Sequence, residues 1–184
     1  SADEISETYC VMSSQLSRLK NYVSSMNDLQ RLEDIPISVK PANASDLLET
    51  LKDTAEIVCS GKQLIFQNEV FVESLVLDTE IVMQVFENLL SNAVRYAKTS
   101  VSVVCKTHGC IFSISVMDDG NGFDSAALKS ATDPFYTTEK KAESQHFGLG
   151  LNICKILCLR HGGSIVLNNC SSGGASVTAS FEMN

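Results

Sequence analysis

The chain has 184 residues, of which 44% are apolar, and it carries a formal net charge of -8 at pH 7. This length is enough for one domain with its own core plus an appendage. The negative charge argues against a nucleic-acid partner, because binding to a phosphate backbone needs clustered Lys and Arg. No apolar run approaches the roughly 18 residues of a membrane span, and no signal-peptide pattern opens the chain, so we expect a soluble, cytoplasmic protein.

The seven cysteines are scattered, odd in number and mostly set among apolar neighbours. This usage is typical of reduced, buried thiols in a cytosolic compartment. Cys154 and Cys158 share a helix face four residues apart, but no CxxC pair or His pair completes a set of four ligands. Zinc binding is therefore the less favoured alternative.

Apolar residues between positions 5 and 26 recur at alternating steps of four and three, which is the spacing of a coiled-coil seam. The pattern favours a helix in a bundle or dimer, and the alternative is one amphipathic helix packed on its own domain. Pro36 and Pro41 then bracket a short extended segment that cannot continue a helix. We therefore predict a helical part at 1–35 and a second domain at 36–184.

The second part contains both helical and strand patterns. Asn43 or Ser45 is expected to cap its first helix, and Thr79 its long second helix. Because strands and helices do not alternate strictly, we predict helices on one face of a largely antiparallel sheet. The expected helices are 44–60, 79–97 and 149–160, and the expected strands are 63–68, 74–77, 101–106, 111–117, 164–168 and 175–181.

The most informative motif lies inside the long helix, at residues 87–96. Asn88 and Asn92 stand on adjacent turns about 40° apart, with Arg95 and Tyr96 flanking them. Two amide oxygens at such a place suit a Mg²⁺ that takes its other ligands from water and phosphates, and Arg95 suits a phosphate oxygen. The alternative is a pair of solvated helix asparagines.

A second motif, Asp-Asp-Gly-Asn-Gly-Phe, starts at Asp118, directly after an apolar strand. A carboxylate at a strand end can accept a hydrogen bond from an exocyclic amine, and glycines let the backbone approach a flat ring. The alternative is a plain turn, because Asp, Asn and Gly are also the ordinary turn residues.

A third motif, residues 146–151, opens the helix that ends at Arg160. Glycines at a helix start expose backbone N–H groups and the positive end of the helix dipole, which suits phosphate oxygens. The alternative is an ordinary loop-to-helix junction. The polar segment 124–145 before it, which contains Phe135, suits a loop that folds over a nucleotide, or else a long surface connection.

In order and spacing, these motifs resemble the asparagine box, first glycine box, phenylalanine box and second glycine box of the GHKL ATPase superfamily, specifically sensor histidine kinases. The resemblance covers 41–181. It implies a Bergerat-type α/β sandwich, in which a mixed, mostly antiparallel sheet has helices on one face and ATP lies beneath a mobile lid. A coiled-coil-like helix would precede this domain.

The resemblance also implies a role for each matching residue. Asn92 would coordinate Mg²⁺ with Asn88 as its helper, Asp118 would accept from the adenine amine, and Asn88 and Arg95 would carry the catalytic roles. The other residues it assigns to ATP are Tyr96, Gly120, Gly122, Phe135, Lys140, Gly148, Leu149, Gly150 and Leu151.

Two positions refine the comparison. Gyrase, mismatch-repair and heat-shock chaperone members of the superfamily have Glu where this chain has Asn88, and Glu87 points about 100° away. Phosphoryl transfer to a protein side chain therefore fits better than fast ATP hydrolysis. His146 replaces a glycine that is frequent in the family, and we favour a lid or helix-entry role for it over a phosphate contact.

None of the three histidines, His108, His146 and His161, lies in the first helix. By resemblance, residues 1–35 are the end of a dimerisation bundle whose acceptor helix is absent. We therefore expect a fragment of a membrane-anchored receptor that passes the γ-phosphate of Mg-ATP to a histidine on a helix outside it, for a response regulator. The whole protein would be a homodimer. The alternatives are an anti-sigma-type serine kinase and a nucleotide-dependent or dead scaffold.

Overall fold

The computed structural model describes residues 12–13, 36–137 and 148–183. Most of the helix predicted at the start of the chain, and the positions Lys140 and His146, lie outside the described residues. The division of the chain into 1–35 and 36–184 therefore stays a prediction.

Five strands form the main sheet, in the order β2-β4-β5-β7-β6. β2 pairs with β4 in parallel, and the three other pairings are antiparallel. β1 (Lys40–Asn43) and β3 (Ser74–Leu77) form a separate antiparallel pair. The five strands are β2 (Gln63–Glu69), β4 (Ser100–His108), β5 (Ile111–Asp118), β6 (Ser164–Asn169) and β7 (Ala175–Glu182).

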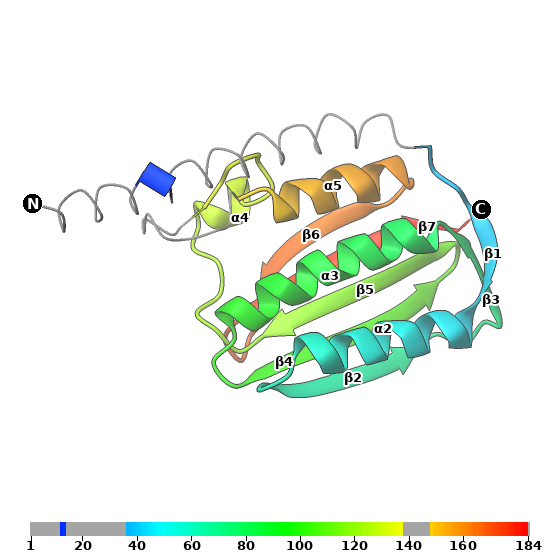
Figure 1. The fold of residues 1–184 in the computed structure, drawn as a ribbon, viewed down its shortest axis with the longest axis horizontal. Coiled ribbons are helices and arrows are strands. Elements are labelled where there is room, and N and C mark those ends of the chain that lie inside the picture. Colours follow the sequence, from blue (N-terminus) through cyan, green and yellow to red (C-terminus); the bar gives the residue numbers. More distant parts are fainter. Residues whose placement is uncertain (1–11, 14–35, 138–147, 184) are drawn as a thin grey trace, which may run out of the picture.

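Three helices, α2 (Ala44–Val58), α3 (Thr79–Tyr96) and α5 (Gly150–Arg160), lie on one face of this sheet (Figure 1). The predicted arrangement of a mixed, mostly antiparallel sheet with helices on one face is thereby confirmed. None of the helices in the described part of the chain is both long and apolar enough to span a bilayer.

A short fourth helix, α4 (Ala127–Ser130), was not predicted. The sequence pattern of 124–145 predicts a polar loop. The helix forms because the Asp124 carboxylate accepts hydrogen bonds from the backbone N–H groups of Ala126 and Ala127, at 2.9 and 2.7 Å. These bonds satisfy amide groups that a helix start otherwise leaves unpaired.

The core lies between the inner face of the sheet and α3. Alternate residues of β4, β5 and β7 point inward, and α3 covers them with one broad apolar face, because a strand repeats every two residues and a helix every 3.6. Asn88 and Asn92 lie at the edge of this face. The buried residues of the two layers include Val82, Val85, Phe86, Leu89, Leu90, Val101, Val103, Phe112, Ile114, Ala179 and Phe181.

The cap of α3 differs from the prediction, because Asp78 and not Thr79 precedes the first turn. Asp78 Oδ1 accepts from the backbone N–H groups of Glu80 and Ile81, at 3.1 and 3.2 Å. Its Oδ2 accepts from the N–H of Ser38 at 2.6 Å. One buried carboxylate therefore joins the segment before β1 to the start of α3.

The backbone of Asp78 makes a further connection, to the end of α5. Its N–H donates to Nε2 of His161 at 2.8 Å, and the His161 ring lies edge-on to Phe181 with ring centroids 5.5 Å apart. His161 is 4% exposed, so it is a core residue that links two helices.

We predict that Asp78→Ala lowers the free energy of unfolding by about 1–2 kcal/mol, because a helix cap and a long-range bond are lost together. Urea unfolding followed by circular dichroism measures this change. Thr79→Ala is the matched control and leaves stability nearly unchanged. Equal losses in the two variants would contradict this assignment of the cap.

Candidate active site

A cavity of about 840 Å³ collects the three sequence motifs. Its size falls within the range of small-molecule sites in proteins. Gly120 and Phe135 are the two candidate residues of the described part that do not line it, and Lys140 lies outside the description. The candidates that line it are Asn88, Asn92, Arg95, Tyr96, Asp118, Gly122, Gly148, Leu149, Gly150 and Leu151.

Other lining residues gave no signal in the sequence. Ala127 and Ala131 come from the unpredicted α4 and its end, and Ala175 and Val177 come from β7. The β7 residues reach the cavity because β7 pairs with β5, with Val177 opposite Val116. Tertiary pairing therefore completes a wall that local patterns cannot reveal.

The two asparagines of α3 face the start of α5. Asn88 Nδ2 donates to the carbonyl of Gln84 at 2.9 Å, which fixes the orientation of the side-chain amide. A Cβ atom added to Gly150 would lie 3.2 Å from Asn88 Oδ1 and 3.7 Å from Asn92 Nδ2. Glycine at position 150 thus keeps space open beside both amides.

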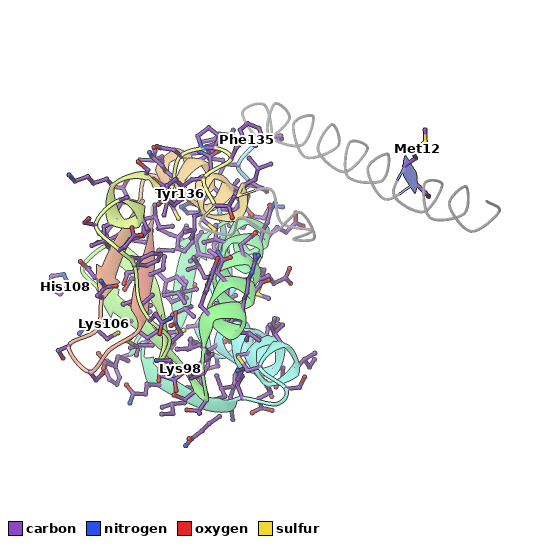
Figure 2. All side chains as sticks on the ribbon, turned by 90° about the vertical axis from the view of Figure 1, so that its left-hand side faces the viewer. Met12, Lys98, Lys106, His108, Phe135 and Tyr136 are labelled. Atoms are coloured by element: carbon purple, nitrogen blue, oxygen red, sulfur yellow. The ribbon has the colours of Figure 1, made fainter. Side chains whose placement is uncertain are left out.

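The start of α5 has no side-chain cap, since Leu149 occupies the N-cap position. Its first N–H groups carry the positive end of the helix dipole. Gly148 has φ of 69°, and a Cβ there would collide with the carbonyl of Tyr136. Glycine at position 148 therefore allows the backbone at Tyr136 to lie this close to the start of α5. Figure 2 shows Tyr136 and the neighbouring Phe135 over α5.

Asp118 ends β5 and lines the cavity from the side of the sheet. Its Oδ1 accepts from the N–H groups of Gly120 and Ala175, at 2.8 and 3.3 Å, which fixes the carboxylate. Burial raises the pKa of Asp118, although both hydrogen bonds act in the opposite direction. An acceptor that is partly desolvated and held in place suits the recognition of a ligand amine.

The adjacent Asp119 has a structural role that the motif at 118–123 does not indicate. Its carboxylate accepts from the N–H groups of Lys98, at 2.8 Å, and Thr99, at 3.0 Å, and also from the Thr99 hydroxyl. These bonds, led by the hydroxyl, hold the pKa of Asp119 well below its usual range. Asp119 thus fastens the chain just after α3 to the chain just after β5.

Gly120 and Tyr96 form a second contact between the same two elements. A Cβ on Gly120 would collide with the carbonyl of Tyr96, so only glycine permits this approach. Arg95 lies over the Tyr96 ring, with Cζ 5.5 Å from the ring centroid, a cation–π distance. Gly120 therefore shapes the cavity without lining it.

Cys154 and Cys158 are fully buried in α5. Burial raises the pKa of Cys158 to about 12, so its thiol stays protonated at neutral pH. Among the described residues, no group of three or more His, Cys, Asp or Glu side chains is arranged to hold a metal ion.

The family model for histidine kinase-, DNA gyrase B- and HSP90-like ATPases matches residues 77–184, which is more than half of the chain. The chain belongs to this ATPase family. Its members bind ATP, and the match includes α3, both aspartates and the start of α5, the elements that form the cavity.

Among curated relatives, the chain is 31% identical to the sensor histidine kinase SpaK of Bacillus subtilis over 173 residues, covering 91% of this chain and 38% of SpaK. It is 31% identical to the nisin biosynthesis sensor protein NisK of Lactococcus lactis over 101 residues, covering 49% of this chain and 21% of NisK. The chain therefore spans well under half the length of these relatives.

Solved structures share the fold. Full-length ShkA in complex with AMPPNP aligns with a TM-score of 0.73 at 22% identity, over 89% of this chain and 37% of ShkA. The mycobacterial sensor histidine kinase MprB aligns with a TM-score of 0.66 at 16% identity, over 80% of this chain and 99% of that structure. The ATPase-domain architecture thus persists at low sequence identity.

We predict that Asp119→Ala lowers the melting temperature at pH 7 by about 3 °C. A lowered pKa in the folded state stabilises the fold above the unfolded pKa of about 3.9, and this contribution disappears as the pH falls through the folded pKa. The difference from wild type should therefore shrink on acidification below about pH 4, as calorimetry at several pH values would measure. Asp53→Ala, on the exposed side of α2, is the control, and a gap that does not depend on pH would contradict the mechanism.

Proposed function

We propose that this ATPase-family chain is the catalytic domain of a sensor histidine kinase, which transfers the γ-phosphate of ATP to a histidine outside residues 1–184. One observation carries the proposal: the amides of Asn88 and Asn92 face the uncapped start of α5 in a cavity that Asp118 also lines. Amide oxygens, free N–H groups and a fixed carboxylate are the groups that a metal, a phosphate chain and an adenine amine need.

Asn92 and Asn88 would hold Mg²⁺, because the space beside their amides is open and Mg²⁺ accepts one or two protein oxygens. When bound, Mg²⁺ neutralises charge on the phosphate oxygens. The N–H groups at Gly150 and Leu151 would bind phosphate oxygens, and Arg95 would neutralise another. Lys140 would add a further cation from the lid.

At the other end of the cavity, Asp118 would accept a hydrogen bond from the adenine amine. Gly120 and Gly122 would let the backbone approach the ring, and Tyr96 would flank the nucleotide. Phe135 would anchor the lid close to Gly148, where an added Cβ would lie 2.8 Å from the Phe135 carbonyl carbon. These roles follow from the resemblance. The positions of Asp118, Gly122 and Tyr96 in the cavity lining support theirs, whereas Gly120 and Phe135 do not line it.

Transfer of the γ-phosphate to a protein side chain fits the residue at position 88 better than ATP hydrolysis does. A carboxylate that activates water would stand at position 88, where this chain has Asn88, and Glu87 is exposed outside the cavity lining. Asn88 and Arg95 would instead orient and neutralise the transferred phosphate.

Neither histidine of the described residues is suited to be the phosphate acceptor. His108 lies at the outer edge of the molecule, on the β4–β5 hairpin (Figure 2), and His161 is buried. We propose a histidine on a dimerisation helix of the full-length homodimer, with a response regulator as the next acceptor. The chain would then be the cytoplasmic part of a membrane-anchored receptor. The names of the relatives support this proposal over a serine kinase or a scaffold.

We predict that Gly150→Ala weakens ATP binding about tenfold while the melting temperature is kept or raised, because alanine favours a helix and its Cβ fills the space beside Asn88. Calorimetric titration with Mg-ATP measures the affinity. Leu159→Ala, an exposed position of the same helix, is the control. Unchanged affinity in Gly150→Ala would contradict the proposed phosphate position.

The direct test adds γ-labelled ATP and Mg²⁺ to the chain together with separately prepared dimerisation helices of the full-length kinase. We expect label on a histidine, and a rate about 100-fold lower for Asn92→Ala, since an electrostatic contact to the transferred group is lost. Asn168→Ala, on the exposed end of β6, is the control. Label on serine would favour the serine kinase, and no label despite ATP binding would favour the scaffold.

A further inference from the structure

One wall of the cavity is the segment 123–132, which contains α4. Phe123, Asp124, Ala127 and Ala131 contribute its lining residues. α4 has four residues, and a helix this short is not stable by itself. The position of this wall must therefore be fixed by contacts with other elements.

Asn169, the last residue of β6, holds the first end of the wall. Its Oδ1 accepts from the N–H of Phe123 at 2.7 Å, and its Nδ2 donates to the carbonyl of Phe123 at 2.8 Å. The side-chain amide thus pairs with both polar groups of one backbone residue, 46 positions away in sequence. A Cβ on Gly122 would lie 2.7 Å from Asn169 Oδ1, so glycine at 122 makes room for this contact.

Asn152, in the first turn of α5, holds the other end. Its Nδ2 donates to the carbonyl of Thr132 at 2.9 Å. Lys155 lies three residues later on the same helix face, and its Nζ is 3.4 Å from the Thr132 hydroxyl. Neither Asn169 nor Asn152 is among the residues that line the cavity.

We infer that Asn169 and Asn152 are positioning residues, which fix the wall 123–132 at its two ends and thereby set the affinity of the cavity for its nucleotide. Between them, the Asp124 carboxylate accepts from the N–H groups of Ala126 and Ala127 just before and at the start of α4, so the wall behaves as one element with two attachment points. The inference rests on the proposed nucleotide site. It concerns residues that act through the backbone and touch no ligand.

The test measures the affinity for Mg²⁺ and a nonhydrolysable ATP analogue in Asn169→Ala, Asn152→Ala and the double variant. Each single change should weaken binding about tenfold, which corresponds to about 1.4 kcal/mol and is within the range of one or two hydrogen bonds. Because release of one end already frees the wall, the fold-loss of affinity in the double variant should be smaller than the product of the two single fold-losses. Asn168→Ala, the exposed neighbour of Asn169, should bind as wild type does.

A second measurement separates positioning from general destabilisation. Hydrogen exchange of the nucleotide-free variants should accelerate at the amides of 123–132 and stay unchanged in α3 and β5. Asn152→Ala is expected to fold, because alanine is the better helix former. Asn169→Asp keeps the acceptor for the Phe123 N–H but places a second acceptor opposite the Phe123 carbonyl, so it should weaken binding at least as much as Asn169→Ala.

Wild-type affinity in both single variants, fully multiplicative losses, or unchanged exchange at 123–132 would each overturn the inference. Asn92→Ala, measured alongside, tests the underlying site. If Asn92→Ala also binds as wild type does, the proposed function has failed. If Asn92→Ala loses binding and neither Asn169→Ala nor Asn152→Ala does, only the inference about the wall 123–132 has failed.

Discussion

The site depends on the attachment of the end of α3 to the end of β5. Asp119 binds the backbone at Lys98 and Thr99, and Gly120 lies directly against the Tyr96 carbonyl. α3 carries the asparagines and β5 carries Asp118, so this attachment sets their separation. A cavity that must recognise both ends of an elongated ligand needs such a fixed distance, because errors in position weaken every contact at once.

An acidic protein with a net charge of -8 has to create local positive potential to bind a polyphosphate. In the proposed site, backbone and amide groups would supply most of it. The uncapped start of α5 supplies N–H groups, Gly148 and Gly150 keep side chains away from them, and Arg95 adds one guanidinium. The first N–H groups of α5 therefore have no side-chain acceptor, and a bound phosphate would take that place.

Strong periodicity made most of the fold predictable. The apolar face of α3 and the alternating strands β4, β5 and β7 were expected close to their observed bounds, and the motifs placed ten of the candidate residues in one cavity. The misses have different causes. Asp78 caps α3 through local bonds to Glu80 and Ile81, one residue before the predicted Thr79, and α4 is too short to show a period. Asn169 reaches Phe123 across 46 positions.

The two adjacent aspartates have different roles, because one lines the cavity and the other holds two segments of the fold together. Asp118 points into the cavity, and burial raises its pKa, whereas Asp119 binds a turn outside it and its pKa is lowered. Asp119 is occupied by backbone and hydroxyl donors outside the cavity, whereas Asp118 lines it. In the proposed site, a substitution at either position would weaken nucleotide binding for a different reason: loss of the proposed direct contact at 118, and displacement of α3 relative to β5 at 119. Stability separates the two, because the desolvation cost of Asp118 disappears with its charge, while the loss of Asp119 removes bonds that hold the fold.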